Sequence, residues 1–352
     1  MFLNASAPPL LAVKSSVDVD SILDTVSIVF YLLTIVLGLT GNSVVIWVAG
    51  FKLKPKVTNV WLVNLAVADL VFCLSRVLSV VKKLFFHRWP FGLLLCKFNG
   101  FFKYTNMFCS VFLLAVISLD RALCVWWPVF TRRRRTVRAA RVVAALVWAA
   151  AAGFSAPYFV YRKVYLGKRN VTKCSLEVKE AAAGDDTAKL ALYSVRFLCG
   201  FLFPFMVILV CYILAGLGIR RTRLSGKSRP LRILALLVVA FFLCWAPYHC
   251  LLLAKMVNSK TQAVTISLTL AKGLAYFNSC VNPLLYFCMG LQGRGCLGQS
   301  LVGVFRRALA GDQDRGTSQS VERTLDDSSG SGAMRLSSAE RVVRPRAGGT
   351  GQ

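Results

Sequence analysis

Acidic side chains are scarce in this chain, in which 15 Asp and Glu residues stand against 43 Lys and Arg residues and leave a net charge of +28. Histidine is scarcer still, because only His87 and His249 occur and they are far apart in the sequence. An enzyme that works inside a membrane needs paired acids or histidines to move protons. The shortage of both argues against an enzyme. The sequence also shows no internal repeat, which argues against many transporter folds.

A basic segment followed by an apolar core is missing from the first 26 residues. A cleavable secretory signal has both parts in that order. Residues 1–26 are therefore predicted to form an extracellular N-terminal segment rather than a signal peptide.

Apolar side chains, by contrast, make up 56% of the residues, against about 45–50% in an ordinary soluble domain. They gather in seven runs, each long enough to cross a bilayer, which takes about 20 helical residues. The runs cover residues 27–51, 58–81, 93–123, 140–160, 189–217, 230–257 and 263–290. A helix satisfies all its backbone hydrogen bonds within one span in lipid. The sequence therefore predicts an all-α membrane protein, with a seven-transmembrane helix bundle over residues 27–290.

Charge in the loops predicts the orientation of the bundle. Asp18, Asp20 and Asp24 precede the first run, whereas basic clusters follow the first and third runs and separate the fifth from the sixth. Basic loops stay in the cytoplasm, so the N-terminus is predicted to lie outside a plasma membrane. Asn4 and Asn170, each in an Asn-X-Ser/Thr sequence, would then be glycosylated. The anionic inner leaflet, rather than nucleic acid, explains much of the positive charge.

Two of the 12 cysteines differ from the rest in their position. Most lie inside the apolar runs, where packed thiols are expected. Cys96 lies at the outer end of the third run and Cys174 in the second outer loop. Both face the oxidising side of the membrane, so a disulfide between them is predicted. It would hold this loop across the helix bundle.

Each run carries a short motif. In order, the motifs are Gly41-Asn42, Leu65-Ala66-Val67-Ala68-Asp69, Asp120-Arg121, Trp148, Pro204, Cys244-Trp245-Ala246-Pro247 and Asn282-Pro283-Leu284-Leu285-Tyr286. The ordered set resembles the rhodopsin-like G-protein-coupled receptors. Two longer strings, His87-Arg88-Trp89-Pro90-Phe91-Gly92 and Arg196-Phe197-Leu198-Cys199-Gly200-Phe201-Leu202, resemble the chemoattractant group. That group includes the formyl-peptide, chemerin, anaphylatoxin and chemoattractant-type prostaglandin D receptors.

The resemblance implies a receptor that couples to heterotrimeric G proteins of the inhibitory class, with receptor kinases and arrestin as further partners. Ala122 departs from the aromatic residue or cysteine that usually follows the Asp-Arg pair. The alternative is a decoy receptor that captures a chemoattractant peptide without signalling. The intact Arg121 and Tyr286 argue against it.

A sodium site is implied around Asp69, a lone carboxylate in the middle of the second run, where an unpaired charge is costly. The resemblance adds Asn106, Ser110, Asn278 and Asn282 as the residues that surround the ion. Their oxygens suit a hard cation. The alternative is a hydrogen-bonded polar cluster with a protonated Asp69. No other cofactor or metal is expected.

The resemblance also assigns switching roles to seven residues: Asp120, Arg121, Tyr212, Trp245, Pro247, Pro283 and Tyr286. Asp120 would hold Arg121 at rest, and the two tyrosines would meet near Arg121 in the active state. Each proline removes a helix hydrogen bond and so permits a kink. No acid occurs between residues 220 and 232 to restrain Arg121 by a second ion pair. Ligand-free signalling is therefore expected to be appreciable.

Four cations lie in the outer halves of different runs: Arg76, Lys103, Arg196 and Lys272. Each would cost roughly 2.5–3.5 kcal/mol if left at the bilayer centre, and no acid lies in the outer halves to pair with them. The pattern predicts a cavity for an anionic ligand that binds through a carboxylate. The alternative is that Lys103 and Lys272 reach water and Arg76 bonds backbone carbonyls.

Three further residues bear on the type of ligand through the resemblance. Tyr104 and Leu192 stand where formyl-peptide receptors carry an acid and a second arginine, which argues against a formylmethionine ligand. Arg162 stands where the prostaglandin-type receptor carries a basic residue that meets the ligand acid, but chemerin-type receptors share much of the surrounding string. A lipid acid such as a prostanoid and a peptide C-terminus both remain open.

Beyond the seventh run, residues 291–310 are predicted to form an amphipathic helix on the inner leaflet. Cys296 in this helix is a candidate for palmitoylation, with a free thiol as the alternative. Residues 311–352 are rich in Ser, Gly, Asp and Arg and are predicted to be a disordered cytoplasmic tail. Kinases and arrestin would act there, on Thr317, Ser318, Ser320, Thr324, Ser328 and Ser329. The alternative is a plain solvated tail.

Overall fold

A computed structural model describes residues 10–86, 88–167, 171–176, 185–222, 228–257 and 262–291. All of them lie in one compact unit, Met1–Leu309. Several predictions fall outside the described residues: the glycosylation sites Asn4 and Asn170, the amphipathic helix after Leu291 with Cys296, and the tail 311–352 with its six phosphorylation sites.

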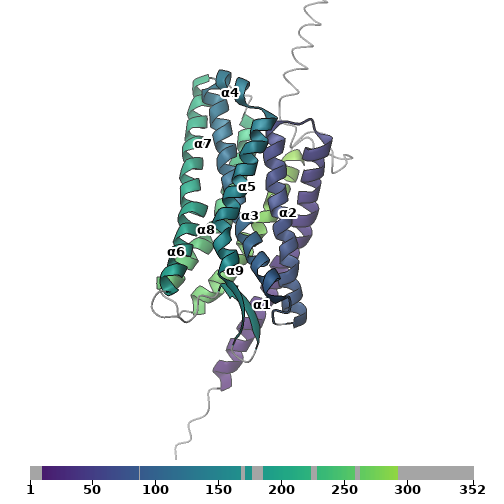
Figure 1. Cartoon of the computed structure of the whole chain (residues 1–352), viewed down its shortest axis with the longest axis vertical. Helices are drawn as coiled ribbons and strands as arrows, with labels where there is room; N and C mark the ends of the chain where they lie inside the picture. The colour runs from purple at the N-terminus through teal and green to yellow at the C-terminus, as the bar shows by residue number, and fades with distance from the viewer. Residues whose placement is uncertain are drawn as a thin grey trace, which may run out of the picture. The chain divides into compact units, whose positions relative to one another are not determined.

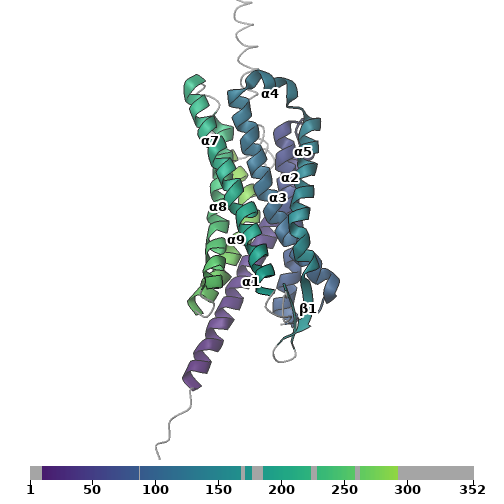
Figure 2. The ribbon, with the colours of Figure 1, turned by 60° about the vertical axis from the view of Figure 1, so that its left-hand side comes forward.

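Seven long helical stretches form most of the described part of the chain and run side by side in Figures 1 and 2. They are α1 (Leu10–Trp47) with η1 (Val48–Lys52), α2 (Val57–Val81) with η2 (Lys82–Phe86), α3 (Gly92–Trp126), α5 (Val137–Val160), α6 (Asp185–Phe197) with η4 (Leu198–Leu202) and α7 (Phe203–Thr222), α8 (Ser228–Val257), and α9 (Gln262–Leu291). The predicted seven-helix bundle is confirmed.

Six of these stretches are long and apolar enough to cross a membrane by length and composition, within the residues that the structure describes. The stretch that is not among them is α9, which has 30 residues but carries Lys272, Asn278 and Asn282. The two asparagines are buried, so α9 owes its lower hydropathy to polar side chains that face its neighbours rather than lipid.

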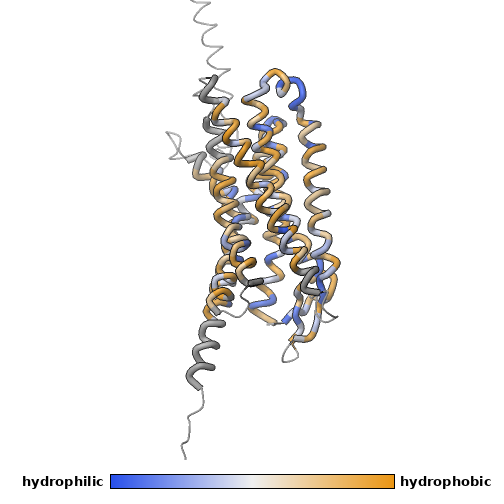
Figure 3. Tube along the Cα trace, turned by 90° about the vertical axis from the view of Figure 1, so that its left-hand side faces the viewer, coloured by the Kyte–Doolittle hydropathy of each residue, from blue (hydrophilic) through white to orange (hydrophobic). Residues whose placement is uncertain are grey.

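The bundle has apolar side chains on its outside and polar ones within. Leu33, Leu146 and Ile213 are exposed, whereas Asn42 and Asp69 are buried. Figure 3 shows the apolar colouring along the helices and the polar colouring where the chain turns near α4. A large exposed apolar surface of this kind marks contact with a membrane.

A hairpin lies against α3 at one end of the bundle and consists of β1 (Arg162–Leu166) and β2 (Thr172–Leu176), which pair antiparallel with Val164 opposite Cys174. The predicted disulfide is present, since Cys174 is bonded to Cys96 at the start of α3. The hairpin itself was not predicted. At the opposite end lies the short α4 (Pro128–Arg134) (Figure 1).

Motif residues join the helices to one another. Asn42 of α1 donates hydrogen bonds to the carbonyls of Gly38 and of Ser279 in α9, both at 2.9 Å. A Cβ on Gly41 would lie 2.7 Å from the Pro283 ring, so only glycine lets α1 approach α9 this closely. Trp148 of α5 donates to Asn64 of α2 at 3.0 Å. The motifs therefore join α1 to α9 and α5 to α2.

The helices differ from the predicted runs mainly in two places. α1 begins at Leu10, well before residue 27, so part of the predicted N-terminal segment is helical. The fifth span contains the π-helix η4 just before Pro204. Proline has no N–H and its ring clashes with the carbonyl four residues earlier, here that of Gly200. Widening the helix at η4 relieves that clash and turns the residues before it, including Arg196, relative to those after it.

Candidate functional site

Three of the four predicted cations are buried in the bundle. The exposed fraction is 3% for Arg76 on α2, 8% for Lys103 on α3 and 1% for Arg196 on α6. The ion pairs in the described part of the chain join other residues: Lys83 to Asp24, and two arginines to Asp120. Within that part, the three buried cations therefore have no acidic partner.

Tyrosine rings surround Arg196 instead of acids. Its Nη1 donates a hydrogen bond to the Tyr104 hydroxyl at 3.0 Å. Its guanidinium carbon lies 5.3 Å, 5.0 Å and 5.2 Å from the ring centres of Tyr104, Tyr193 and Tyr248. A cation over an aromatic face gains about 0.5–2 kcal/mol, more where water is excluded. The rings thus offset part of the cost of burying this charge.

Lys103 shares two of these rings. Its Nζ lies 5.1 Å from the ring centre of Tyr104, 5.5 Å from that of Tyr248 and 5.2 Å from that of Tyr276. The alternative in which Lys103 reaches water is not what the structure shows, because the side chain turns inward among tyrosines and is buried.

Arg76 extends the arrangement to α2. Its guanidinium carbon lies 5.1 Å from the Tyr276 ring and 4.7 Å from the Phe72 ring. Its Nη2 donates to the side-chain oxygen of Asn99 at 2.7 Å and to the Ser75 hydroxyl at 3.1 Å. Nη2 also donates to the backbone carbonyl of Asn99 at 3.5 Å, so a backbone bond of the kind that the alternative required is present, although the side-chain oxygens are nearer. We call the continuous group a cation–tyrosine cluster: Arg76, Lys103 and Arg196 with Tyr104, Tyr193, Tyr248 and Tyr276.

The cluster retains hydrogen-bond donors that nothing in the described part of the chain accepts. Nε and Nη2 of Arg196 are buried and have no partner there. Buried polar groups in folded proteins are nearly always satisfied, and exceptions call for an explanation. Two adjacent guanidinium N–H groups match the two oxygens of a carboxylate. The arrangement can therefore bind an anionic group between α3 and α6.

The two remaining predicted cations lie next to the cluster. Arg162 of β1 packs on Gly100 of α3, where a Cβ would lie 2.6 Å from Arg162 Cδ. Burial lowers the pKa of Arg162, and the nearby Arg76 lowers it as well, as expected where like charges gather. Lys272 is half-buried on α9, one turn before Tyr276. The predicted set thus surrounds one region of the bundle.

Sequence reasoning missed most of the tyrosines. Of these, it named Tyr104 alone, and it missed Tyr158, Tyr193, Tyr248 and Tyr276. Tyr158 of α5 stacks on Tyr104 with ring centres 3.6 Å apart and planes at 25°. A usable signal was present, because a tyrosine in an apolar run needs a hydrogen-bond partner when it is buried.

Asp69 lies at the centre of a second polar group, deeper in the bundle. It is fully buried, with Oδ1 accepting from Asn106 Nδ2 at 2.8 Å and Oδ2 accepting from Asn282 Nδ2 at 2.7 Å. Ser279, which was not predicted, donates to the Asn106 oxygen at 3.4 Å. An ionised carboxylate accepts on both oxygens in this way.

The other two residues of the predicted sodium set contribute oxygens of a different kind. Ser110 Oγ and Asn278 Oδ1 are buried and have no hydrogen-bond partner in the described part of the chain. No contact of either with Asp69 is seen. Both are hard oxygen donors, which suits Na⁺. The two amide nitrogens take one acceptor position on each oxygen of a carboxylate that has about four, so a cation can bind there without displacing either amide.

At the other end of the bundle, Asp120 is held by two arginines. Arg121 Nη2 donates to Oδ2 at 2.8 Å, whereas Arg135 reaches Oδ1 with Nε at 2.7 Å and Oδ2 with Nη2 at 3.1 Å. Both arginines also donate to the Thr58 hydroxyl, at 2.9 Å and 3.2 Å. Burial lowers the pKa of Arg135, but its hydrogen bonds to Asp120 outweigh this and raise it. Sequence reasoning missed Arg135.

The remaining predicted switch residues lie inside helices or carry buried polar atoms that a movement of the helices could bring together. Trp245 is 1% exposed and precedes Pro247 inside α8, and Pro283 lies inside α9. The hydroxyls of Tyr212 and Tyr286 and Nε of Arg121 are buried, without a hydrogen-bond partner in the described residues. A movement that joined these groups would satisfy atoms that are unsatisfied in this state.

Comparisons with known proteins agree on one group. A family model described as "7 transmembrane receptor (rhodopsin family)" matches residues 41–286. The C3a anaphylatoxin chemotactic receptor of Danio rerio is 41% identical over 289 residues, covering 81% of this chain and 78% of that protein. The fMet-Leu-Phe receptor of Macaca mulatta is 36% identical, covering 86% and 91%. The chemerin-like receptor 1 of Rattus norvegicus is 37% identical, covering 75% of both.

Proposed function

Because this chain belongs to the rhodopsin family of seven-transmembrane receptors, and within it to the chemoattractant receptors, we propose that it binds an extracellular ligand through a carboxylate and activates a G protein of the inhibitory class. It is a multi-pass plasma-membrane receptor and not an enzyme. G protein and ligand are the partners that the family implies.

The observation that carries the ligand proposal is the cation–tyrosine cluster. Arg196 offers two buried N–H groups without an acceptor in the described residues, and Lys103 lies against two of the same rings. A ligand carboxylate would receive charge-assisted hydrogen bonds there, about twice as strong as neutral ones. Two ligand classes carry that group, namely a lipid acid such as a prostanoid and a peptide with a free C-terminus.

The first experiment measures suppression of cyclic AMP in cells that express this chain, with and without pertussis toxin. The panel holds prostanoids and fatty acids together with C3a, fMet-Leu-Phe and chemerin peptides, the ligands in the names of the relatives. Each compound is paired with its esterified or carboxyl-amidated form. A toxin-sensitive response that is lost on blocking the carboxylate is expected. A response that survives the blocking would overturn the role of the carboxylate, and arrestin recruitment without any cyclic AMP change would overturn coupling.

The proposal extends to the inner end of the bundle. Arg121, Tyr212 and Tyr286 are the groups that would engage or accommodate the G protein when the helices move, and their unsatisfied atoms support that role. Receptor kinases and arrestin would act on the tail 311–352, which lies outside the described residues.

We also propose Asp69 and its neighbours as the site of an allosteric sodium ion, which would stabilise the resting state. Raising sodium from zero, with choline replacing it at constant ionic strength, should weaken agonist binding by roughly fivefold, the lower end of allosteric coupling. The Asp69→Asn variant should lose this dependence because it lacks the charge that attracts the ion. Agonist affinity that stays constant across the sodium series of the unmodified receptor would contradict the site.

A further inference from the structure

Basic side chains gather on the hairpin, which lies at the end of the bundle opposite α4 (Figure 2). Side chains alternate between the two faces of a strand. Lys163 of β1 pairs with Ser175 of β2. Two positions along, Tyr165 pairs with Lys173, so all four side chains share one face of the hairpin. Both lysines are exposed, and their diagonal positions bring like charges to about 7–8 Å of each other.

The opposite face of the hairpin packs on the bundle. Cys174 on that face is bonded to Cys96 of α3. Arg162, also on that face, packs so closely on Gly100 of α3 that a Cβ there would lie 2.6 Å from Arg162 Cδ. The face that carries the two lysines therefore points away from the bundle.

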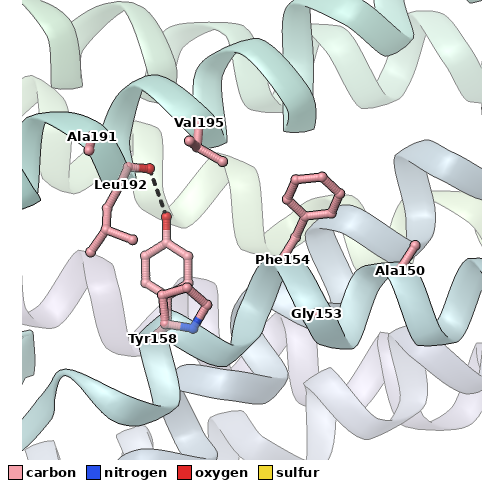
Figure 4. Close-up of a pocket in the computed structure, with 8 residues that line it drawn as sticks. Ala150, Gly153, Phe154, Tyr158, Ala191, Leu192 and Val195 are labelled. Carbon is pink, nitrogen blue, oxygen red and sulfur yellow. Dashed lines mark hydrogen bonds between the residues drawn. The ribbon is translucent and has the colours of Figure 1, made fainter.

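Hydrogen bonds hold the hairpin in place in addition to the disulfide. The backbone N–H of Trp89, in the loop between α2 and α3, donates to the Thr172 carbonyl at 2.9 Å. Strand β1 follows α5 almost directly. Near the end of α5, the Tyr158 hydroxyl donates to the Leu192 carbonyl of α6 at 3.0 Å (Figure 4). The lysines are therefore presented from a fixed platform rather than from a free loop.

Further cations extend this surface onto the end of α2. Arg88 is exposed and directly precedes Trp89. Lys82 of η2 lies within electrostatic range of Lys173. We call the group the outer basic surface: Lys82, Lys83, Arg88, Lys163 and Lys173. Lys83 pairs with Asp24, whereas the other four cations take part in no ion pair among the described residues.

Membrane topology gives no reason for these cations. The Cys96–Cys174 disulfide marks this end of the bundle as the outer one, since disulfides persist on the oxidising side of a membrane. The charges that orient a membrane protein are basic residues on the inner side. Like charges that gather without acids repel one another and destabilise the compact state. The outer basic surface therefore calls for an anionic partner outside the cell.

We propose that the outer basic surface binds a sulfated glycosaminoglycan chain of the cell surface or the extracellular matrix. Groups of lysine and arginine are typical of heparin-binding surfaces. Lysine carries a point charge on a flexible stem, without the fixed fork of arginine, which suits sulfates at irregular positions along a chain. Between the two hairpin lysines, the Ser175 hydroxyl donates to the Tyr165 hydroxyl at 3.3 Å. Both hydroxyls can also bond sugar hydroxyls.

An acidic protein would fit this surface less well. Protein interfaces are built around a buried apolar centre with a polar rim. The outward face of the hairpin offers two lysines, a serine and one half-buried tyrosine, so it has no such centre. A polysaccharide brings charge and hydroxyl groups without apolar side chains, and this matches the composition of the face.

The test uses intact cells that express the full-length receptor and make no glycosaminoglycan of their own, so that a probe reaches the outer end alone. Binding of a fluorescent heparin oligosaccharide is measured at matched surface levels. Lys163→Gln and Lys173→Gln should each weaken binding by about threefold, within the range of an exposed ion pair. The double variant should lose about tenfold. Exchanging both lysines for arginine keeps the charges and should keep the affinity.

The matched control combines Lys54→Gln and Lys56→Gln, which remove two exposed lysines before α2, at the inner end. It changes the net charge equally and should bind heparin like the unmodified receptor. Fully desulfated heparin and polyglutamate should each compete at least tenfold less well than heparin. Unchanged binding in the double glutamine variant, an equal loss in the control, or equal competition by either competitor would each overturn the proposal. The measurement needs neither an agonist nor a G protein, so its result is independent of the proposed function.

Discussion

Replacing Arg196 with alanine should weaken the response to a carboxylate ligand by about 30-fold or more. Removing one partner of a buried, hydrogen-bonded charge pair costs about 2–5 kcal/mol, and each 1.4 kcal/mol is a factor of ten. Arg196 is the cation with two unused N–H donors, and it is 1% exposed, so water would compensate little. The measurement is the concentration of the active panel compound that gives half-maximal suppression of cyclic AMP.

The controls for this variant separate charge recognition from folding. Lys97→Ala removes a cation from α3 that lies over the Phe159 ring at 5.4 Å, outside the cation–tyrosine cluster, and it should leave the response unchanged. Surface staining shows whether each variant reaches the membrane. Arg196→Ala should also abolish the preference for the free acid over the amidated compound. An Arg196→Ala receptor at normal surface level that still prefers the free acid would contradict the site.

The spanning helices, the disulfide and the buried cations could be predicted from the sequence, because a wrong placement of these residues would cost much free energy. Apolar runs of about 20 residues have few alternatives to spanning helices, because unpaired backbone groups are costly in lipid. The Cys96–Cys174 disulfide followed from the side of the membrane on which the two residues lie. Buried cations without nearby acids were equally readable, since a lone charge in an apolar run stands out.

The sequence was less able to predict which side chains contact one another, because these contacts depend on how each helix is rotated about its own axis. The tyrosines of the cation–tyrosine cluster come from four different helices, and their convergence depends on how each helix turns. The π-helix η4 changes the direction in which Arg196 points from its helix, and the hydrophobic pattern of the sequence does not predict a π-helix there. Arg135 was hidden for another reason. It belongs to a run of four arginines that reads as a solvated loop, and only the fold places it against Asp120.

That contact gives the second large prediction, because Arg135 competes with Arg121 for one carboxylate. Arg135 takes both oxygens of Asp120, and Arg121 shares one of them with it. Two guanidinium groups at the same oxygen also repel each other. Arg135→Ala should therefore let Asp120 hold Arg121 more firmly and lower ligand-free signalling by about tenfold, the effect of one charge-assisted hydrogen bond.

The measurement is cyclic AMP suppression without ligand, at matched surface levels. Arg134→Ala is the control, because Arg134 is the exposed neighbour at the end of α4 and has no bond to Asp120 among the described contacts. It should leave ligand-free signalling unchanged.

Asp120→Asn should have the opposite effect to Arg135→Ala, since it releases Arg121 from its only carboxylate in the described region. Ligand-free signalling that rises in Arg135→Ala would instead make Arg135 a restraint on the resting state. If the unmodified receptor without ligand signals no more than cells that lack the receptor, the premise that Asp120 holds Arg121 only weakly would be wrong.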